Sequence, residues 1–139
     1  MSCVFCGIIE GGTPASIVMR DDDVVAFLDA RPLFKGHVLV VPRAHVVTLA
    51  DLPPAGLPPL FGAVQRMSRA VVEACAAQGS FVALNNVVSQ SVPHLHVHVV
   101  PRTKGDGLKG FFWPRTKYES DQERDRYADQ IGAVFRALP

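Results

Sequence analysis

Apolar and polar positions follow two different periods along this chain, and these periods predict its elements. Short runs rich in β-branched residues, bounded by polar, glycine or proline residues, are typical of strands. In the middle of the chain, apolar residues recur at steps of three and four, the period of an amphipathic helix that buries one face. This long helix includes Leu60, Val64, Met67, Val71 and Cys75, and Gly79 is expected to close it.

The order of the expected elements is typical of a small α+β protein. A short helix over residues 4–10 is expected to stop at Gly11 and Gly12, and a last helix is expected over residues 121–137. The last helix is expected to pack through Tyr127, Ile131, Val134 and Leu138. Strands are expected at residues 17–19, 24–28, 36–42, 81–84 and 94–100. The fold class is therefore predicted to be α+β, built on a largely antiparallel sheet.

The last of these strands carries three histidines at two-residue spacing. Successive side chains of a strand point to opposite faces, so His94, His96 and His98 are expected on one face, with apolar residues on the other. The pKa of histidine lies near neutral pH, and such a row can attack an electrophile, relay protons or bind a metal. A solvated face with accidental histidines is the plain alternative. Against it, three of the chain's five histidines fall within five positions.

Composition narrows the classes of function. With 139 residues, 48% of them hydrophobic, the chain is long enough for one domain with a real core. Fourteen Lys and Arg against thirteen Asp and Glu give a net charge of +1, so no general attraction to nucleic acid or membranes is expected. No run approaches the ~18 apolar residues of a membrane span, and the first residues lack a signal-peptide pattern. Three cysteines do not make a disulfide framework, and we expect a soluble cytoplasmic protein.

Cys3 and Cys6 have the spacing with which two thiolates bind one tetrahedral zinc ion. Such a pair needs two more ligands, and His45 and His94 are the obvious donors. A redox dithiol is the alternative. That motif normally opens a helix after a strand in a thioredoxin-like unit, and no strand is expected before Cys3.

The run from Gln90 to Arg102 resembles the signature of the histidine triad (HIT) nucleotide hydrolases and transferases. Upstream, residues 3–9, 27–29 and 36–45 are similar to the family in order and spacing. The resemblance covers roughly residues 3–102. It implies a single HIT domain over residues 1–139, in which a HIT-like antiparallel sheet is followed by an extension over residues 103–139.

By this resemblance, His96 is the nucleophile that attacks the α-phosphorus of a nucleotide. The nucleotidyl-histidine formed is then resolved by water or another acceptor. A backbone carbonyl or His94 is expected to hold the other ring nitrogen of His96, and His98 to donate to a phosphate oxygen. The resemblance also implies that Asp29 is the ribose-binding carboxylate. Polar contacts to the phosphate and leaving group would come from Ser91, Gln90 and one of Asn85 and Asn86. The apolar base slot would be formed by Phe5, Ile8 and Phe27. Plain core packing is the alternative for the three apolar residues.

The resemblance further implies a structural zinc on Cys3, Cys6, His45 and His94, as in the family's zinc-containing branch. It implies a homodimer that pairs the long helix, through Val64, Met67, Val71 and Val72, and an edge strand. The turn over residues 85–90 is shorter than in most relatives and has no glycine, which puts in question any position that needs a positive φ.

The run that follows the histidine strand, Pro101-Arg102 and then Lys104-Gly105-Asp106, resembles the diadenosine-polyphosphate hydrolase branch more than the phosphoramidase branch. Arg102, Lys104 and Lys109 could neutralise a polyphosphate tail, and Phe111, Phe112 and Trp113 could stack on a second base or seal a dimer. A solvated loop is the alternative for the basic residues. Dinucleoside polyphosphates, nucleoside phosphoramidates and nucleotidylated acceptors all remain candidate substrates.

Two other functions remain open at this point. One is a metal-dependent hydrolase that uses the His-x-His strand, although nothing acidic follows His98 until Asp106. The other is a nucleotide-binding or scaffolding module without catalysis. Sensitivity of turnover to a chelator tests the first alternative, and a covalent adduct on His96 tests the second.

Overall fold

The computed structural model describes residues 2–108 and 115–139. Contacts between residues divide the chain into two compact units, Met1–Asp106 and Gly107–Pro139. The sequence pointed to Lys109, Phe111, Phe112 and Trp113 as candidate contacts for a polyphosphate tail or a second base, and these four residues lie outside the described ones.

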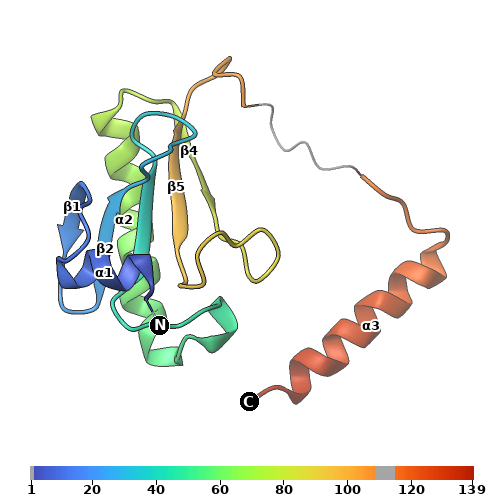
Figure 1. Cartoon of the computed structure of the whole chain (residues 1–139). Helices are drawn as coiled ribbons and strands as arrows, with labels where there is room; N and C mark the ends of the chain where they lie inside the picture. Colours follow the sequence, from blue (N-terminus) through green and yellow to red (C-terminus); the bar gives the residue numbers. More distant parts are fainter. Residues whose placement is uncertain (1, 109–114) are drawn as a thin grey trace. The chain divides into compact units, whose positions relative to one another are not determined.

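The first unit is built on a five-stranded sheet in the order β1-β2-β3-β5-β4 (Figure 1). All neighbouring strands are antiparallel. The strands are β1 (Ile17–Arg20), β2 (Val24–Leu28), β3 (Val38–Pro42), β4 (Gly79–Ala83) and β5 (Val97–Arg102). Helix α1 (Val4–Glu10) precedes β1, and helix α2 (Leu57–Ala74) connects β3 to β4 after two short 3₁₀ turns, Leu49–Asp51 and Pro54–Gly56. The α+β prediction is confirmed.

Each face of the sheet is covered by a different helix, with α1 on one side and α2 on the other (Figure 1). Alternate residues of β2 and β3 therefore enter two separate apolar clusters. Those on the α2 face include Val24, Ala26, Val38 and Val40, and those on the α1 face include Val25, Phe27, Leu39 and Val41. Because neither face of these two strands meets water, their sequences are continuous apolar runs rather than alternating ones.

The histidine-bearing strand begins later than predicted. β5 starts at Val97, and His94 and His96 lie in the irregular segment just before it. In that segment the Leu95 amide donates to the Val46 carbonyl at 2.7 Å, so its backbone is paired with a loop rather than with β3. The predicted alternation is nevertheless confirmed, because Leu95 is buried on the α2 face while His94 and His96 contact Phe5 of α1.

Two other boundaries differ from the sequence prediction. β3 starts at Val38 instead of residue 36, because the His37 amide closes a turn onto the Phe34 carbonyl. Gly79 does not close the long helix. α2 ends at Ala74, the left-handed residue is Ala76 (φ 51°), and Gly79 opens β4.

The second unit contains helix α3, Asp121–Ala137, at the predicted bounds. The Ser120 side chain caps it by accepting a hydrogen bond from the Glu123 amide at 3.0 Å. Its predicted packing residues, Tyr127, Ile131, Val134 and Leu138, are 49% to 67% exposed, so the second unit does not bury them by itself. Among the described residues, every helix falls short of the length or the apolar character that a membrane crossing requires.

Candidate functional site

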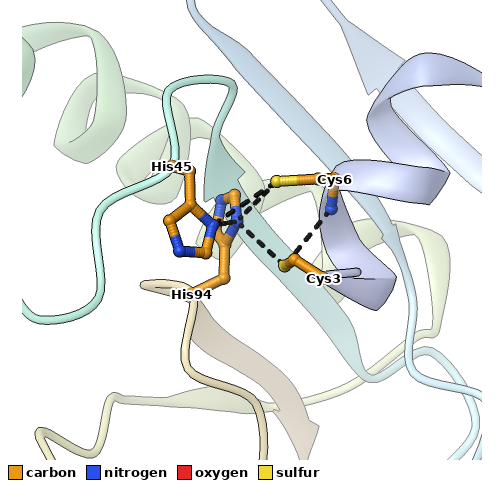
Figure 2. A group of neighbouring side chains, drawn as sticks. All are labelled: Cys3, Cys6, His45 and His94. Atoms are coloured by element: carbon orange, nitrogen blue, oxygen red, sulfur yellow. Dashed lines mark hydrogen bonds between the residues drawn. The ribbon is translucent and has the colours of Figure 1, made fainter. Parts of the chain in front are cut away.

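The four predicted zinc ligands converge beside the amino end of α1 (Figure 2). His94 Nδ1 lies 3.5 Å from Cys3 Sγ, 3.6 Å from Cys6 Sγ and 3.2 Å from His45 Nδ1. Cys6 Sγ lies 3.4 Å from His45 Nδ1. A tetrahedral zinc with bonds of ~2.0–2.3 Å places its ligand atoms roughly 3.3–3.8 Å apart. The donor set and its spacing therefore fit zinc. We refer to these four residues as the Cys/His group.

Local structure prepares the Cys/His group for a cation. Pro42 presents its carbonyl oxygen 2.9 Å from His94 Nε2, and because a carbonyl only accepts, Nε2 carries the proton and Nδ1 keeps its lone pair. Burial lowers the pKa of His94, which favours the neutral ring that a metal requires. Burial raises the pKa of the Cys6 thiol, and a side-chain hydrogen bond with Cys3 and charge repulsion add to this effect.

His96 is held by the same segment in one tautomer. Its Nδ1 lies 2.7 Å from the His94 carbonyl oxygen, so Nδ1 donates and the neutral ring keeps its lone pair on Nε2. The ring is 3% exposed and packs edge-on against Phe5 and His98, with centroids 5.1 and 5.0 Å away. The backbone carbonyl, rather than the His94 side chain, therefore fixes the nitrogen that is free to react.

His98 is oriented by a residue absent from the predicted site, His37. The Leu33 amide donates to His37 Nδ1 at 3.1 Å, so His37 carries its proton on Nε2. That nitrogen lies 2.9 Å from His98 Nδ1, which must accept, and the proton of neutral His98 is therefore on Nε2. Burial, with smaller contributions from His96 and His37, lowers the pKa of His98 to about 4. At neutral pH, His98 is thus an uncharged donor through Nε2.

Asp29, His37 and His98 also lie within 4.8 Å of one another, yet their hydrogen bonds exclude a shared metal. Asp29 Oδ2 is 3.7 Å from His37 Nε2. A metal on His37 would need the Nε2 lone pair, but the Leu33 amide occupies the other ring nitrogen and leaves the proton on Nε2. We call these three residues the relay group, because they hold a proton in place instead of ligating a cation.

The placement of His37 depends on Gly36. Gly36 adopts φ +97°, and a side chain there would bring a Cβ to 2.5 Å from Cys75 Sγ. The His37 carbonyl accepts from the Asp29 amide at 2.9 Å, which continues the β2–β3 pairing by one step. The sequence signal that could have found His37 is a histidine directly after a glycine at the start of a buried strand.

The three apolar residues predicted for the base slot line a pocket. This pocket of about 640 Å³ is lined by Phe5, Ile8, Phe27 and Asp29, together with residues 13–16. The rings of Phe5 and Phe27 meet edge to face at 5.2 Å, and the three apolar residues also belong to the core on the α1 face, so core packing holds and base binding stays a prediction. Asp29 accepts from the Arg31 amide at 2.9 Å and is the only acidic lining residue that the structure describes.

Three of the predicted phosphate-binding side chains make hydrogen bonds to the backbone that hold the turn over residues 85–90 in place. Asn86 accepts from the Leu49 amide at 2.8 Å, and Gln90 donates to the Val47 carbonyl at 2.6 Å. Asn85 donates to the Ser89 carbonyl at 3.2 Å. None of the three lines the described pocket, and Ser91 is exposed. Their contact with phosphate stays a prediction.

The turn reaches left-handed geometry without glycine. Val87 has φ 68° and Ser89 has φ 63°. Each left-handed non-glycine residue costs roughly 1–2 kcal/mol, and the side-chain bonds of Asn85 and Gln90 hold the turn in this shape. The missing glycines of this sequence therefore do not prevent positive φ.

Arg102 is committed to a local ion pair. Its guanidinium donates to Asp106 through two bonds of 2.6 and 3.1 Å at the far end of β5. Arg102 lies four positions after His98 along the strand, a distance of roughly 13 Å. Its charge is balanced where it lies, which weakens the expectation that it neutralises a polyphosphate tail.

Comparisons with known proteins point to one family. A model of the HIT domain matches residues 10–105. An uncharacterized HIT-like protein of Mycobacterium tuberculosis is 41% identical over 110 residues, 78% of this chain and 76% of that protein. Among solved structures, a member of the HIT family from Bacillus subtilis has a TM-score of 0.88 at 30% identity and covers 96% of both chains. A zinc-bound histidine triad family protein from Mycobacterium smegmatis has a TM-score of 0.74 at 36% identity, covering 96% of this chain and 98% of that one.

Three further relatives are named for an activity. An adenylylsulfatase of Arabidopsis thaliana is 35% identical over 76% of this chain and 55% of its own length. A bis(5'-nucleosyl)-tetraphosphatase of Schizosaccharomyces pombe is 39% identical over 58% of this chain and 46% of its own. An adenosine 5'-monophosphoramidase of the same yeast is 30% identical over 82% of this chain and 84% of its own.

Proposed function

The chain belongs to the HIT family, and on that basis we propose that it is a nucleotide hydrolase or nucleotidyl transferase with His96 as its nucleophile. The substrate is a nucleotide whose α-phosphate carries a phosphoanhydride or phosphoramidate leaving group. One observation carries the proposal: the 2.7 Å bond from His96 Nδ1 to the His94 carbonyl leaves Nε2 with its lone pair. The domain comprises a core of residues 3–102 and an extension of residues 103–139.

In the first step, the Nε2 lone pair of His96 forms a bond to the α-phosphorus, and the bond from phosphorus to the leaving group breaks. The leaving group departs with that electron pair and takes a proton from water. The nucleotidyl-imidazolium keeps its proton on Nδ1 and donates it in a hydrogen bond to the His94 carbonyl, whose partial negative charge stabilises the cationic ring.

In the second step, an oxygen of water or of another acceptor attacks the phosphorus. The phosphorus–nitrogen bond breaks, its electron pair returns to His96 Nε2, and the acceptor's proton passes to solvent. Splitting one displacement into two lowers each barrier. His98 donates from Nε2 to a phosphate oxygen in both steps. As a neutral ring whose pKa is lowered to about 4, it acts as a hydrogen-bond donor rather than as an acid.

The pocket beside α1 suits the nucleoside. Phe5, Ile8 and Phe27 supply apolar walls for a base, and Asp29 supplies a carboxylate for the ribose hydroxyls. Phe5 also contacts the His96 ring, so a base in the pocket places its own α-phosphate near the nucleophile. Ser91, Asn85, Asn86 and Gln90 complete the phosphate contacts in this proposal.

Zinc in the Cys/His group serves structure. The group's four ligands close the coordination shell, so a bound zinc ties the amino end of α1 to the segment before β5 without activating water. The site of action is inside the cell, where reduced thiols remain available as ligands.

A homodimer is part of the proposal, but its contact surface differs from the one that the sequence analysis suggested. Val64, Met67 and Val71 of α2 pack on the chain's own sheet and are 4% to 6% exposed, so they cannot supply the contact suggested by the sequence. The open edge of the sheet at β4 and the exposed Leu57 and Phe61 of α2 offer an alternative. Light scattering tests this, because a mass near the 15.0 kDa of one chain would rule the dimer out.

The three relatives with named activities share a nucleotidyl phosphate and differ in the group that leaves it. The decisive assay therefore offers adenosine 5'-phosphosulfate, adenosine 5'-phosphoramidate and diadenosine tetraphosphate, and measures release of AMP at saturating substrate. We expect turnover of at least one substrate, retained after treatment with a chelator. Binding of all three without turnover would favour a non-catalytic module.

The metal-dependent hydrolase is not supported by the site geometry. His94 faces the Cys/His group, His96 faces a carbonyl and His98 faces His37. Three histidines with three different partners do not converge on one open metal. Loss of all turnover with chelator at saturating substrate would revive that alternative.

A further inference from the structure

Helix α1 takes part in both the Cys/His group and the nucleoside pocket. We propose that it couples the two, so that metal binding at the Cys/His group raises nucleotide affinity and nucleotide binding raises metal affinity. The inference rests on the proposed function, since it takes the pocket beside α1 as the nucleoside site.

The coupling has a direct structural basis in Phe5. This residue stands between the ligands Cys3 and Cys6 in sequence, and it lines the pocket. Its ring lies 5.2 Å from that of Phe27 in the pocket wall, 6.0 Å from the ligand His94 and 5.1 Å from His96. A change in how α1 is held at Cys3 and Cys6 therefore moves a wall of the pocket.

The helix is too short to hold this position alone. α1 has seven residues, whereas isolated helices below ~12–15 residues are marginal in water. Its other supports include the burial of Phe5, Ile8 and Ile9 and a hydrogen bond from the Arg20 guanidinium to the Ile9 carbonyl at 2.8 Å. The amide of Thr13 also donates to the Gly7 carbonyl at 3.1 Å, at the carboxyl end of the helix. Without a cation, two cysteines and two histidines at its amino end lose their common partner. Local opening of α1 then costs less than opening of the sheet.

The effect falls on binding more than on chemistry. His96 depends on the His94 carbonyl, and that segment has supports of its own, the Leu95 amide on Val46 and the His94 ring on Pro42. Metal loss should therefore raise the dissociation constant of a nucleotide while leaving the nucleophile's tautomer in place. By linkage, the same factor applies to the metal's affinity when nucleotide is bound.

The test uses AMP as the probe and calorimetry on the full chain. Zinc-loaded protein should bind AMP roughly 5- to 150-fold more tightly than metal-free protein, the usual range for coupled sites. His45→Ala is the informative variant, because His45 is exposed, lies outside α1 and contacts that helix through Cys6 Sγ at 3.4 Å. It should weaken AMP binding and abolish the zinc dependence. Cys75→Ala, an exposed cysteine outside the group, is the matched control and should change neither.

Hydrogen exchange provides a second readout that does not require activity. Removal of zinc should speed exchange of the α1 amides while the amides of β3 and β5 keep their protection, and AMP should reverse part of the change. Loss of protection throughout the sheet would show general unfolding and overturn the local mechanism.

Equal AMP affinity with and without zinc, within twofold, would overturn the coupling and leave the proposed function standing. Failure of AMP to bind zinc-loaded protein would instead overturn the proposed function, and this inference with it.

Discussion

The Cys/His group and the relay group lie on the same face of the sheet. They differ in which backbone group, a carbonyl or an amide, hydrogen-bonds the histidine nitrogen that points away from the group. In the Cys/His group, the Pro42 carbonyl accepts a hydrogen bond from His94 Nε2, which keeps its proton and leaves the Nδ1 lone pair open to a cation. In the relay group, an amide of Leu33 occupies His37 Nδ1 and leaves a proton on the nitrogen that faces His98. A backbone acceptor on one ring nitrogen leaves a lone pair on the other nitrogen, which can then ligate a metal. A backbone donor on one ring nitrogen leaves the proton on the other nitrogen, which can then donate a hydrogen bond.

His96 lies between the two groups and follows the first rule. A carbonyl behind its Nδ1 leaves the lone pair on Nε2, as in a metal ligand, but no second ligand from the Cys/His group or relay group shares that lone pair. A hydrogen bond to a backbone carbonyl thus leaves His94 with a lone pair for a cation and His96 with a lone pair for an electrophile. Which chemistry follows depends on the neighbouring side chains.

The largest expected effect is the loss of turnover when His96, which belongs to neither group, is replaced. His96→Asn removes the nucleophile, and turnover should fall by at least about 10³-fold. Zinc content should remain and AMP binding should stay nearly intact, because the four ligands of the Cys/His group and the residues that line the pocket are unchanged. Steady-state kinetics together with elemental analysis of the variant checks this, and retention of more than a few per cent of activity would sink the covalent mechanism.

The second prediction tests directly whether the Cys/His group binds zinc and the relay group does not. His45→Ala should weaken zinc binding by more than about 100-fold, because a ligand of the shell matters at least as much as its outer-shell supports. His37→Ala should leave one zinc per chain. Competition titration with a chromogenic chelator measures both variants. Equal loss of zinc in the two would show that the relay group ligates metal after all.

The third prediction concerns the tautomer of His98. His37→Phe removes the donor that faces His98 Nδ1, and kcat should fall by roughly 10- to 100-fold, less than for the nucleophile. Nitrogen NMR supplies the specific readout, since His98 should no longer be confined to the Nε2–H form. An unchanged His98 spectrum with reduced kcat would reduce His37 to a packing role.

The smallest expected effect is on stability against pH. The pKa of His98 is about 4 in the folded protein against 6.5 in the unfolded chain, so the unfolded state binds the extra proton between these values and stability falls as pH drops through this window. Burial is the main cause of this lowered pKa, His96 and His37 add to it, and the Asp29 carboxylate opposes it. His98→Gln should lessen the loss of unfolding free energy from pH 7 to 4.5 by about 1–2 kcal/mol, allowing for solvent around the ring. Denaturant titrations at both pH values decide it.

The sequence was sufficient where a pattern is local. The spacing of Cys3 and Cys6 predicted a pair of metal ligands, and the apolar runs of β2 and β3 predicted strands. The distant partners His45 and His94 were predicted as available donors and through the resemblance to the family. It was insufficient where a backbone partner comes from a distant loop. The late start of β5 follows from the bond between Leu95 and Val46, and the part played by His37 follows from the Leu33 amide. The end of α2 was missed because an alanine, Ala76, takes the left-handed position where glycine was expected.

The central claim is that His96 Nε2 attacks phosphorus, and trapping the covalent intermediate tests it most directly. The protein is mixed with the substrate that it turns over, denatured within milliseconds at alkaline pH, where phosphorus–nitrogen bonds to histidine persist, and mapped by mass spectrometry. We predict one nucleotidyl group per chain on the peptide that contains His96, absent from His96→Asn and retained in His37→Phe. Turnover without an adduct, or an adduct on His98 instead, would contradict the account.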